Sequence, residues 1–537
     1  MPTLLYTSKK NQTDATAGIW HAGLFFILGC LTVFALAKPY HMDDRGFLEA
    51  ARHILENFPH LYTGTRMFEG KPFPWALFPH PPFVPMYLAG WMSVLKNPGP
   101  VALHLVFLPF PFLAAFSLYR VAKRCEIPPR WATLLFLASP CFFVSAQSLM
   151  TDVPMIAFFL TALALYLEGS SKNDTRISAC SGLVACLAWF CRYPGILVVA
   201  VLFFHALLTK RWKQCLVASA LPLGTFVLWT LATGHASGQS HVQRVFFGFL
   251  NAFYHPFAPQ ALGGRIIAFL SFLGGSIVFP PILLALLLLR RPIASCIPGI
   301  AAVLALGILW MFARGLSCGE ILFGGACLAA GSAVLGIRAK NYSLPTLWLI
   351  GVFVLLVLMT PFATVRYLLP ILPAACLVIV ACIPQNVLRM LLILGAFLPS
   401  LLLSWVDMEV ARGYRNIAQD LCRRKTESAN KLYFSGEWGW RQALDQGGAA
   451  YWKIGAKDFH AGDLLAIPQE ACPSLTTPPS KDWRLVQKMD LRISIPFHLM
   501  NYQSHAGFYS HGWGFLPYAY GKLPSDTIAL YRYEPHG

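Results

Sequence analysis

The sequence contains few charged residues. Asp, Glu, Lys and Arg make up 12% of its 537 residues, and 24 acidic residues stand against 42 basic ones. A chain this poor in charge and 56% hydrophobic has more apolar side chains than one water-soluble core normally holds. Repeated apolar runs of about twenty residues therefore predict an all-α protein that crosses a membrane many times.

Three other patterns are absent from the sequence. It has no zinc-type cysteine spacing, and most of its 14 cysteines lie in apolar runs, where they behave as small hydrophobic residues. No signal-peptide cleavage site follows the first apolar run, residues 18–37, so we expect a retained anchor. No internal repeat is evident, which weighs against an inverted-repeat transporter.

The net charge of +18 comes from short clusters between apolar runs, a pattern typical of membrane topology and not of nucleic-acid binding.

These basic clusters orient the predicted spans. Placed on the inner side of the membrane, they allow about thirteen crossings, with the N-terminus inside. Residues 80–95 are apolar but short and rich in proline, so we expect them to lie on the outer membrane face. The sequence predicts a transmembrane domain at 1–406, with outer loops at 38–98 and 234–264, and a soluble extracytoplasmic domain at 407–537.

The C-terminal part predicts a small α/β domain. Short apolar runs indicate strands at residues 431–434, 464–467, 484–486 and 528–531, and two further segments indicate helices at 410–424 and 440–445. Cys422 and Cys472 are the two cysteines of this polar part. We expect them to form a disulfide if the part is extracytoplasmic.

The segment from Tyr40 to Pro82 holds most of the polar side chains near a membrane face. Asp43 and Asp44 follow the first apolar run, where polar groups are functional candidates by default. One interpretation is that they cap a helix at 45–57, since acidic residues favour a helix N-terminus. The other is that one of these carboxylates acts as a base at the boundary between water and lipid.

Further polar side chains reach the same outer face in the predicted topology. They are Glu69, Lys71 and His80 in the first outer loop, Asp152 at the start of an inward span, Arg192 at an outer reversal, His241 and Arg244 in the second outer loop, and Arg366 before another inward span. These residues also fit structural roles: a helix cap, an interfacial anchor, two surface residues on one helix face, or a surface ion pair. Together, carboxylates facing several cations predict a site that handles a phosphate.

Such a site suits group transfer from a membrane-anchored phosphate. A carboxylate takes the proton of an acceptor hydroxyl that attacks an anomeric carbon, and Arg or Lys stabilises the leaving lipid phosphate. Two alternatives stay open: a transporter or flippase of lipid-linked sugars, and a scaffold whose Trp438, Trp440 and Trp513 bind glycan. A transporter should place charges along a mid-membrane pathway, whereas these charges lie at span ends, which favours the enzyme. The three tryptophans fit a hydrophobic core as well.

Several short motifs with polar residues follow one another along the chain. They are Met42-Asp-Asp-Arg-Gly-Phe, Phe68-Glu-Gly-Lys-Pro, Pro79-His-Pro-Pro-Phe, Thr151-Asp-Val-Pro, His241-Val-Gln-Arg and Arg366-Tyr-Leu-Leu-Pro. In these motifs the chain resembles the GT-C glycosyltransferases with polyprenyl-phosphate-sugar donors, in particular the bacterial aminoarabinose transferase and protein O-mannosyltransferase-like group. The resemblance implies a GT-C membrane domain in a bacterial inner membrane, with the C-terminal domain outside. It also implies membrane lipid, a polyprenyl-phosphate sugar and a lipid, protein or polysaccharide acceptor as partners.

The resemblance also implies roles for individual residues. Asp43 is the expected catalytic base, Asp44 its partner or replacement, and Asp152 the second acidic residue of the site. The expected ligands of the donor phosphate are Lys71, His80, Arg192, Arg244 and Arg366. Glu69 and His241 are expected to form a metal or polar pair, so no cofactor is certain and a divalent metal ion stays open. Gly70 separates Glu69 from Lys71, unlike the family's motif, which makes His80 the alternative to Lys71.

Overall fold

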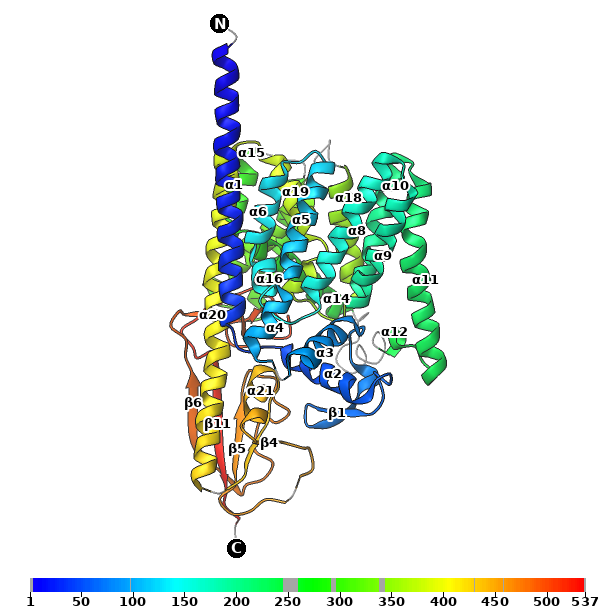
Figure 1. The fold of residues 1–537 in the computed structure, drawn as a ribbon. Helices are drawn as coiled ribbons and strands as arrows, with labels where there is room; N and C mark the ends of the chain where they lie inside the picture. Colours follow the sequence, from blue (N-terminus) through cyan, green and yellow to red (C-terminus); the bar gives the residue numbers. More distant parts are fainter. Residues whose placement is uncertain are drawn as a thin grey trace.

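The computed structural model describes residues 3–96, 98–244, 259–290, 296–337, 343–428, 430–456 and 458–535. Long helices form one thick layer, drawn in the upper part of Figure 1, and a smaller part with β-strands lies below it. This confirms the predicted fold class, a helical membrane part followed by a small C-terminal α/β part.

Helices make up most of the described chain before residue 428. Six of them begin at a proline, whose fixed φ and missing N–H suit the first turn. The helices are α1 (Thr3–Ala37), α2 (Asp44–Asn57), α3 (Phe83–Leu95), α4 (Pro100–Phe107), α5 (Pro109–Arg124), α6 (Pro129–Ala138), α7 (Pro140–Ser145), α8 (Asp152–Lys172), α9 (Thr175–Cys191), η2 (Tyr193–Leu197), α10 (Val198–Thr209), α11 (Trp212–Ser237), α12 (His241–Gln243), α14 (Pro259–Ile277), α15 (Pro280–Arg290), α16 (Ile297–Ala313), α17 (Cys318–Gly336), α18 (Ser343–Met359), η5 (Val365–Leu368), α19 (Leu372–Cys382) and α20 (Asn386–Ser428).

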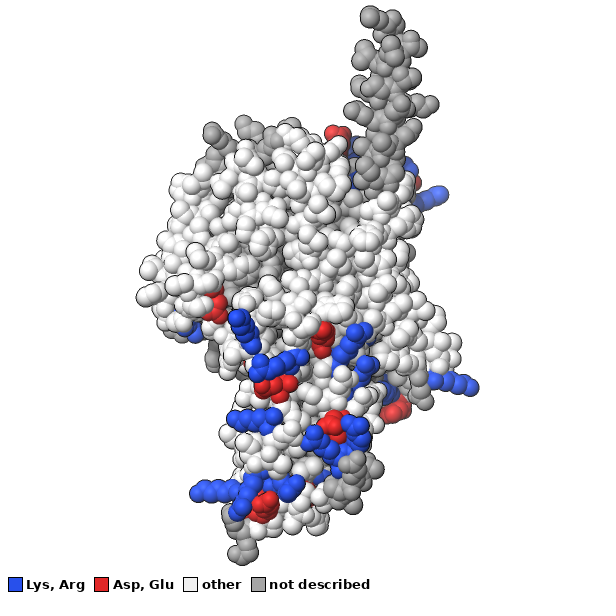
Figure 2. All heavy atoms as spheres, turned by 90° about the vertical axis from the view of Figure 1, so that its left-hand side faces the viewer, with Lys and Arg blue, Asp and Glu red and all other residues white. Residues whose placement is uncertain are grey.

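Fewer helices could cross a membrane than the sequence predicts. Six helices of the described residues are long and apolar enough, and a pair bent by 84°, Leu262–Ile277 with Pro280–Leu289, makes a seventh if it is one span. The prediction of about thirteen is too high by this measure because several of the apolar runs that it counted form helices of only 10–17 residues. The chain is a multi-pass membrane protein. Figure 2 shows that the helical layer presents a broad surface almost without charged side chains, as contact with lipid requires.

The C-terminal part is built on a five-stranded mixed sheet in the order β4–β3–β5–β11–β6. The pairs β5–β11 and β11–β6 are antiparallel, whereas β3 runs parallel to β4 and β5. All four predicted strands lie in this sheet. Its elements are β3 (Leu432–Phe434), α21 (Trp438–Gln446), β4 (Ala450–Tyr451), β5 (Leu464–Pro468), β6 (Trp483–Leu491) and β11 (Asp526–Tyr533), accompanied by the short strands β7 (Phe497–His498), β8 (Met500–Asn501), β9 (Ala506–Gly507) and β10 (Ala519–Tyr520).

Two features join the helical layer to the C-terminal part. Helix α20 runs unbroken through the predicted domain boundary at residue 406 and packs against α6 and α7 in the layer and against α21 below it (Figure 1). The loop after β9 also enters the apolar core of the layer, where Phe508 and Leu516 are buried. A segment of the C-terminal part therefore belongs to the core of the helical layer, while the five-stranded sheet packs on separate apolar clusters.

The expected disulfide between Cys422 and Cys472 is not formed. Cys472 is a free thiol, and its Sγ lies 3.6 Å from Oε1 of Glu69. Cys422 lies on α20, beside Gly447 at the end of α21. The prediction is wrong because two cysteines in one polar region need not face each other, and a disulfide requires Cα atoms within about 7 Å.

Candidate functional site

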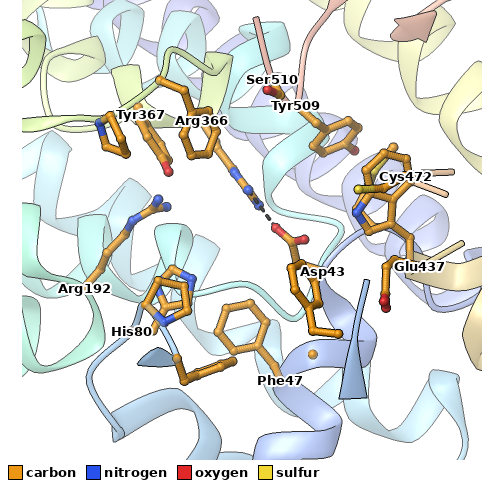
Figure 3. A pocket seen from close by; sticks show the side chains of 18 of the residues that line it. Asp43, Phe47, His80, Arg192, Arg366, Tyr367, Glu437, Cys472, Tyr509 and Ser510 are labelled. Atoms are coloured by element: carbon orange, nitrogen blue, oxygen red, sulfur yellow. Dashed lines mark hydrogen bonds and ion pairs between the residues drawn. The ribbon is translucent and has the colours of Figure 1, made fainter. Parts of the chain in front are cut away.

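A cavity of about 360 Å³ lies where the helical layer meets the C-terminal part. Its wall comes from the start of α2, the hairpin of β1 (Thr65–Phe68) and β2 (Lys71–Pro74), η2, residues 359–367 and the C-terminal loops. Five of the predicted site residues line it: Asp43, Glu69, His80, Arg192 and Arg366. Figure 3 shows four of them, Asp43, His80, Arg192 and Arg366, around this space. Side chains from distant segments thus face one enclosed space.

Asp43 directs its carboxylate into this cavity. It occupies the N-cap position of α2, but its side chain makes no capping hydrogen bond. Instead, Oδ2 of Asp43 accepts a hydrogen bond from Nη2 of Arg366 at 2.7 Å, and the side chain stays 40% exposed. Helix capping therefore does not explain Asp43, and its carboxylate is accessible to a ligand.

Asp44 fixes the turn that carries Asp43. Its two oxygens accept hydrogen bonds from the backbone N–H groups of His41, at 3.0 Å, and Leu149, at 2.8 Å. Met42 has a φ of 45°, in the left-handed region that costs a non-glycine residue free energy. Because Asp44 is fully buried and both its oxygens are bonded, it positions Asp43 and does not itself face the cavity.

Two buried arginines form the cationic side of the cavity. Arg366 lies in η5, and Arg192 ends α9, where its guanidinium lies 4.2 Å from the ring centre of Tyr367 and pairs with Asp152. Burial lowers the pKa of Arg192 to about 10, which leaves it charged at neutral pH. Asp152 begins α8 but makes this ion pair with Arg192. Neither arginine is a lipid-facing anchor.

His80 lies beside the arginines. Its ring centre is 5.0 Å from that of Phe47 and 5.6 Å from that of Phe78. Burial, together with the positive charges of Arg192 and Arg366, holds the pKa of His80 well below its usual range. Its Nδ1 has no hydrogen-bond partner among the described residues. The cavity therefore holds a neutral imidazole that can bond a ligand without adding charge.

The opposite side of the cavity belongs to the C-terminal part and the hairpin. Glu437 accepts hydrogen bonds from Nη1 of Arg441 at 3.0 Å, the hydroxyl of Tyr451 at 2.5 Å and the backbone N–H of Glu69 at 2.9 Å. Burial raises the pKa of the Glu69 carboxyl, and the charge of Glu437 raises it further. The hairpin is thus held against α21 and β4, and it brings a second carboxylate into the wall.

The other predicted residues lie outside the cavity lining. Lys71 is exposed on β2, and Arg244 follows α12. His241 is buried: its Nε2 donates to the carbonyl of Phe78 at 3.0 Å, and its Nδ1 is bonded to the hydroxyl of Tyr193. The surface interpretation of His241 is therefore wrong, since this histidine supports the cavity wall from behind.

The described residues contain no group of three or more His, Cys, Asp or Glu side chains that could hold a metal ion. The expected pair of Glu69 and His241 also has separate partners. Glu69 contacts Cys472, whereas both ring nitrogens of His241 are bonded within the protein.

Several residues of the wall were not expected from the sequence. The guanidinium of Arg66 lies 5.0–5.7 Å from the ring centres of Phe68, Phe73, Trp75 and Phe78, which explains the many aromatic residues of this loop. An arginine within an aromatic-rich loop is a signal that sequence reasoning could have used. In the C-terminal part of the wall, the sequence offers Trp438 and Trp513 as candidates for glycan binding, whereas Glu437, Tyr509 and Ser510 carry no comparable signal.

Comparison with protein families gives one match. Residues 79–234 match the family described as dolichyl-phosphate-mannose-protein mannosyltransferase. The matched segment contains His80, Asp152 and Arg192, and it confirms the predicted resemblance to the protein O-mannosyltransferase-like group. A comparison with curated proteins gives no match.

Solved structures of similar shape include ArnT from Cupriavidus metallidurans bound to undecaprenyl phosphate, at 15% identity and a TM-score of 0.44, covering 84% of this chain and 93% of that chain. The Archaeoglobus fulgidus oligosaccharyltransferase in complex with zinc and sulfate is 13% identical, with a TM-score of 0.46 and coverage of 81% and 63%. The arabinofuranosyltransferase AftD from Mycobacteria is 15% identical, with a TM-score of 0.41 and coverage of 96% and 40%.

Proposed function

We propose that this protein is a membrane glycosyltransferase that moves a sugar from a polyprenyl phosphate to an acceptor hydroxyl. The observation that supports this most is the cavity itself, in which the carboxylate of Asp43 faces Arg366 and Arg192 at the ends of apolar helices. The family match over residues 79–234 supports a lipid-phosphate sugar as donor.

The donor phosphate fits the cationic side of the cavity. Arg192 and Arg366 offer planar, charged donors that can bind phosphate oxygens in pairs, and His80 adds a neutral donor or acceptor. Met359, at the end of the apolar helix α18, and Phe362, just after it, line the same cavity. The isoprenoid chain can therefore leave toward the lipid-facing side of α18, which exposes Leu347, Ile350, Val354 and Leu358.

Asp43 fits the role of general base. It takes the proton of the acceptor hydroxyl while the hydroxyl oxygen forms a bond to the anomeric carbon. The bond between that carbon and the phosphate oxygen breaks, and its electron pair stays on the phosphate. Arg366 and Arg192 stabilise the charge that develops there. The products are a glycosylated acceptor, a polyprenyl phosphate and a proton on Asp43.

The ion pair between Asp43 and Arg366 links donor binding to the base. A phosphate is a second anion that competes with Asp43 for the guanidinium of Arg366. When Arg366 turns to the phosphate, the carboxylate of Asp43 loses its hydrogen-bond donor and is free to accept the proton of the acceptor hydroxyl. Asp152 keeps Arg192 in place, so we assign it a positioning role.

The proposal has consequences for location. The basic clusters would lie on the cytoplasmic side of a bacterial inner membrane with the N-terminus, and the cavity and C-terminal part would lie outside. The C-terminal domain, proposed to begin near residue 407, would then close the site from the external side.

The test is turnover of a radiolabelled polyprenyl-phosphate sugar by the full chain in detergent. Replacing a general base costs about 10²–10⁴-fold in rate, so Asp43→Asn should lower turnover by that factor. Binding of undecaprenyl phosphate should persist. Asp490→Asn is the matched control, because it removes a surface carboxylate that pairs with Arg492 on β6.

Undiminished turnover by Asp43→Asn would remove the base assignment. A wild-type protein that carries the labelled lipid across vesicles without consuming it would favour the flippase alternative.

A further inference from the structure

Asp43 stands between two sides of the cavity that differ in chemistry (Figure 3). One side carries Arg192, Arg366 and His80. The other side carries the carboxylates of Glu69 and Glu437. The acceptor hydroxyl must lie close to both Asp43 and the anomeric carbon of the donor. If the first side holds the donor phosphate, the second side is therefore where the acceptor would lie.

Two tryptophans form the apolar surface of this second side. Trp438 and Trp513 line the cavity, are half-buried, and have ring centres 5.4 Å apart at 48°. Trp513 also stacks on Tyr502, with ring centres 4.9 Å apart at 22°. Trp440, two residues after Trp438, is fully buried in the core of the C-terminal part. Packing therefore accounts for Trp440, whereas the other two indoles pack only in part against the core and also line the cavity.

The backbone at Trp438 is strained. Its φ is 63°, in the left-handed region that a bulky side chain rarely adopts. Strain of this kind persists where surrounding structure imposes it, and it is concentrated at functional sites. The preceding residue, Glu437, is locked by Arg441 and Tyr451, so the turn that presents Trp438 to the cavity is held from both sides.

The polar groups of the second side accept hydrogen bonds and disfavour anions. The carboxylate of Glu69 has no ion-pair partner in the described part of the chain, and its one hydrogen bond comes from Sγ of Cys472 at 3.6 Å. Ser510 accepts from the N–H of Gly512 at 3.2 Å, which leaves its O–H to donate. Hydroxyl groups match this set, whereas phosphate or carboxylate would meet Asp43 and Glu69 as like charges. The arginines near this side already have carboxylate partners: Arg441 pairs with Glu437, and Arg45 and Arg66 pair with Glu49.

We infer that the side of the cavity formed by Trp438, Trp513, Glu69 and Ser510 is an acceptor subsite for an uncharged saccharide. The flat C–H face of a sugar ring packs on an indole, its neighbouring hydroxyls bond to Glu69 and Ser510, and one further hydroxyl reaches Asp43. A serine or threonine side chain has one hydroxyl and no such face, so a peptide uses this surface poorly. This inference rests on the proposed function for its catalytic meaning.

Two measurements on the full chain in detergent test the subsite. The first is donor-independent: uncharged hexose and pentose oligosaccharides are titrated, and intrinsic tryptophan fluorescence is recorded. The second is transfer from the radiolabelled polyprenyl-phosphate sugar to the same oligosaccharides, to uronic-acid oligosaccharides and to serine- and threonine-containing peptides. We expect saturable binding of at least one uncharged oligosaccharide, and transfer to it in preference to the other two classes.

Variants separate this subsite from the donor site. Trp513→Ala and, separately, Trp438→Gly should each raise the dissociation constant and the acceptor KM by about ten-fold, while the donor KM changes by less than about two-fold. The glycine at 438 relieves the positive φ, so this variant keeps the fold even if the first does not. Trp212→Ala, at the 37% exposed start of α11, should change neither constant.

The outcomes distinguish the two proposals. Transfer to peptides or uronic-acid oligosaccharides in preference to uncharged ones overturns the acceptor class and leaves the glycosyltransferase standing. A rise in donor KM in the tryptophan variants, with the acceptor KM unchanged, overturns the subsite. Oligosaccharide binding without any consumption of donor supports the subsite and overturns the proposed function.

Discussion

Arg366 donates to Asp43 at 2.7 Å although 323 residues separate them in the chain. Asp43 comes from the turn before α2, and Arg366 comes from η5 between two apolar helices. Each group keeps the other extended into the cavity, and this places a carboxylate and a guanidinium within reach of one ligand. The pair is therefore the first place where the proposed reaction can be tested by substitution.

Arg366→Lys should impair donor use although it keeps the positive charge. Lysine is a point charge and cannot donate to two phosphate oxygens in one plane, so kcat/KM for the donor should fall by about 10–100-fold. The measurement is the initial rate over a range of donor concentrations. Arg492→Lys, on the surface of the sheet, is the control. Equal kinetics for the wild type and Arg366→Lys would contradict a two-point contact with phosphate.

Asp44→Asn should lower the stability of the protein, whereas Asp43→Asn should lower its rate and leave its stability nearly unchanged. An amide at position 44 can accept only one of the two backbone hydrogen bonds, from His41 and Leu149, and leaves the other donor unsatisfied. This should cost about 1–3 kcal/mol of unfolding free energy. Asp43→Asn affects a 40% exposed side chain and should leave the thermal midpoint nearly unchanged. Thermal unfolding in detergent, followed by circular dichroism, measures both. A destabilised Asp43→Asn with an intact Asp44→Asn would reverse the assignment.

Asp407→Asn should destabilise the junction between α1 and α20. Asp407 is fully buried, and its carboxylate accepts from Nζ of Lys38 at 2.5 Å and from the hydroxyl of Tyr509, a cavity residue, at 2.8 Å. Removing one charge of a buried pair leaves the other uncompensated, at a cost of about 3–5 kcal/mol.

The double variant Lys38→Gln with Asp407→Asn should recover part of this loss, because it leaves no isolated charge. The exposed pair of Asp420 and Arg423 is the control, at about 0–1 kcal/mol. Additive losses for Lys38 and Asp407 would show that they do not interact.

The stability of the protein should fall as the solution becomes more acidic, partly through His80. Burial and nearby arginines hold its pKa well below the ordinary value of 6.5. Below that pH the unfolded chain binds a proton at this site that the folded chain does not. The folded state then loses at most about 1.4 kcal/mol per pH unit. We expect His80→Gln to show a smaller drop in thermal midpoint than the wild type between about pH 8 and about pH 5.

His460→Gln is the control for this experiment, because its side chain is 75% exposed. It should keep the wild-type pH dependence. An unchanged drop in His80→Gln would show that this imidazole takes up its proton as easily in the folded state as in the unfolded state.

The cationic side of the cavity could be predicted because its residues sit where apolar runs end. Asp43 follows one run, and Arg192 and Arg366 precede others, so topology alone places them at one membrane face. Their partners could not be predicted. The pairing of Arg192 with Asp152, and of Arg366 with Asp43, depends on how α8, α9 and η5 pack. The sequence also could not show that Asp44 points inward, because both aspartates fit a helix start equally well.

The position of the residues on the other side of the cavity could not be predicted, although the sequence offered two of them, Trp438 and Trp513, as candidates for glycan binding. Glu437, Trp438 and Trp513 lie in a part of the chain where no membrane span restricts position. Their place depends on the docking of the β1–β2 hairpin, in which the N–H of Gly70 donates to the hydroxyl of Tyr451 at 3.1 Å. The docking of this hairpin also explains why the predicted disulfide is wrong, because Cys472 turns toward Glu69 of the hairpin.

Helix α20 carries the chain without a break from the helical layer to the sheet that closes the cavity. A chain that ended at Ser428 would keep Asp43 and both arginines but would lose the wall that holds Glu437 and the two indoles. Bulk water would then reach the anomeric carbon, and a base that activates an alcohol also activates water. In the proposed reaction the C-terminal part would shield the donor from hydrolysis. The selectivity for an acceptor over water would then depend on a segment far from the leaving phosphate.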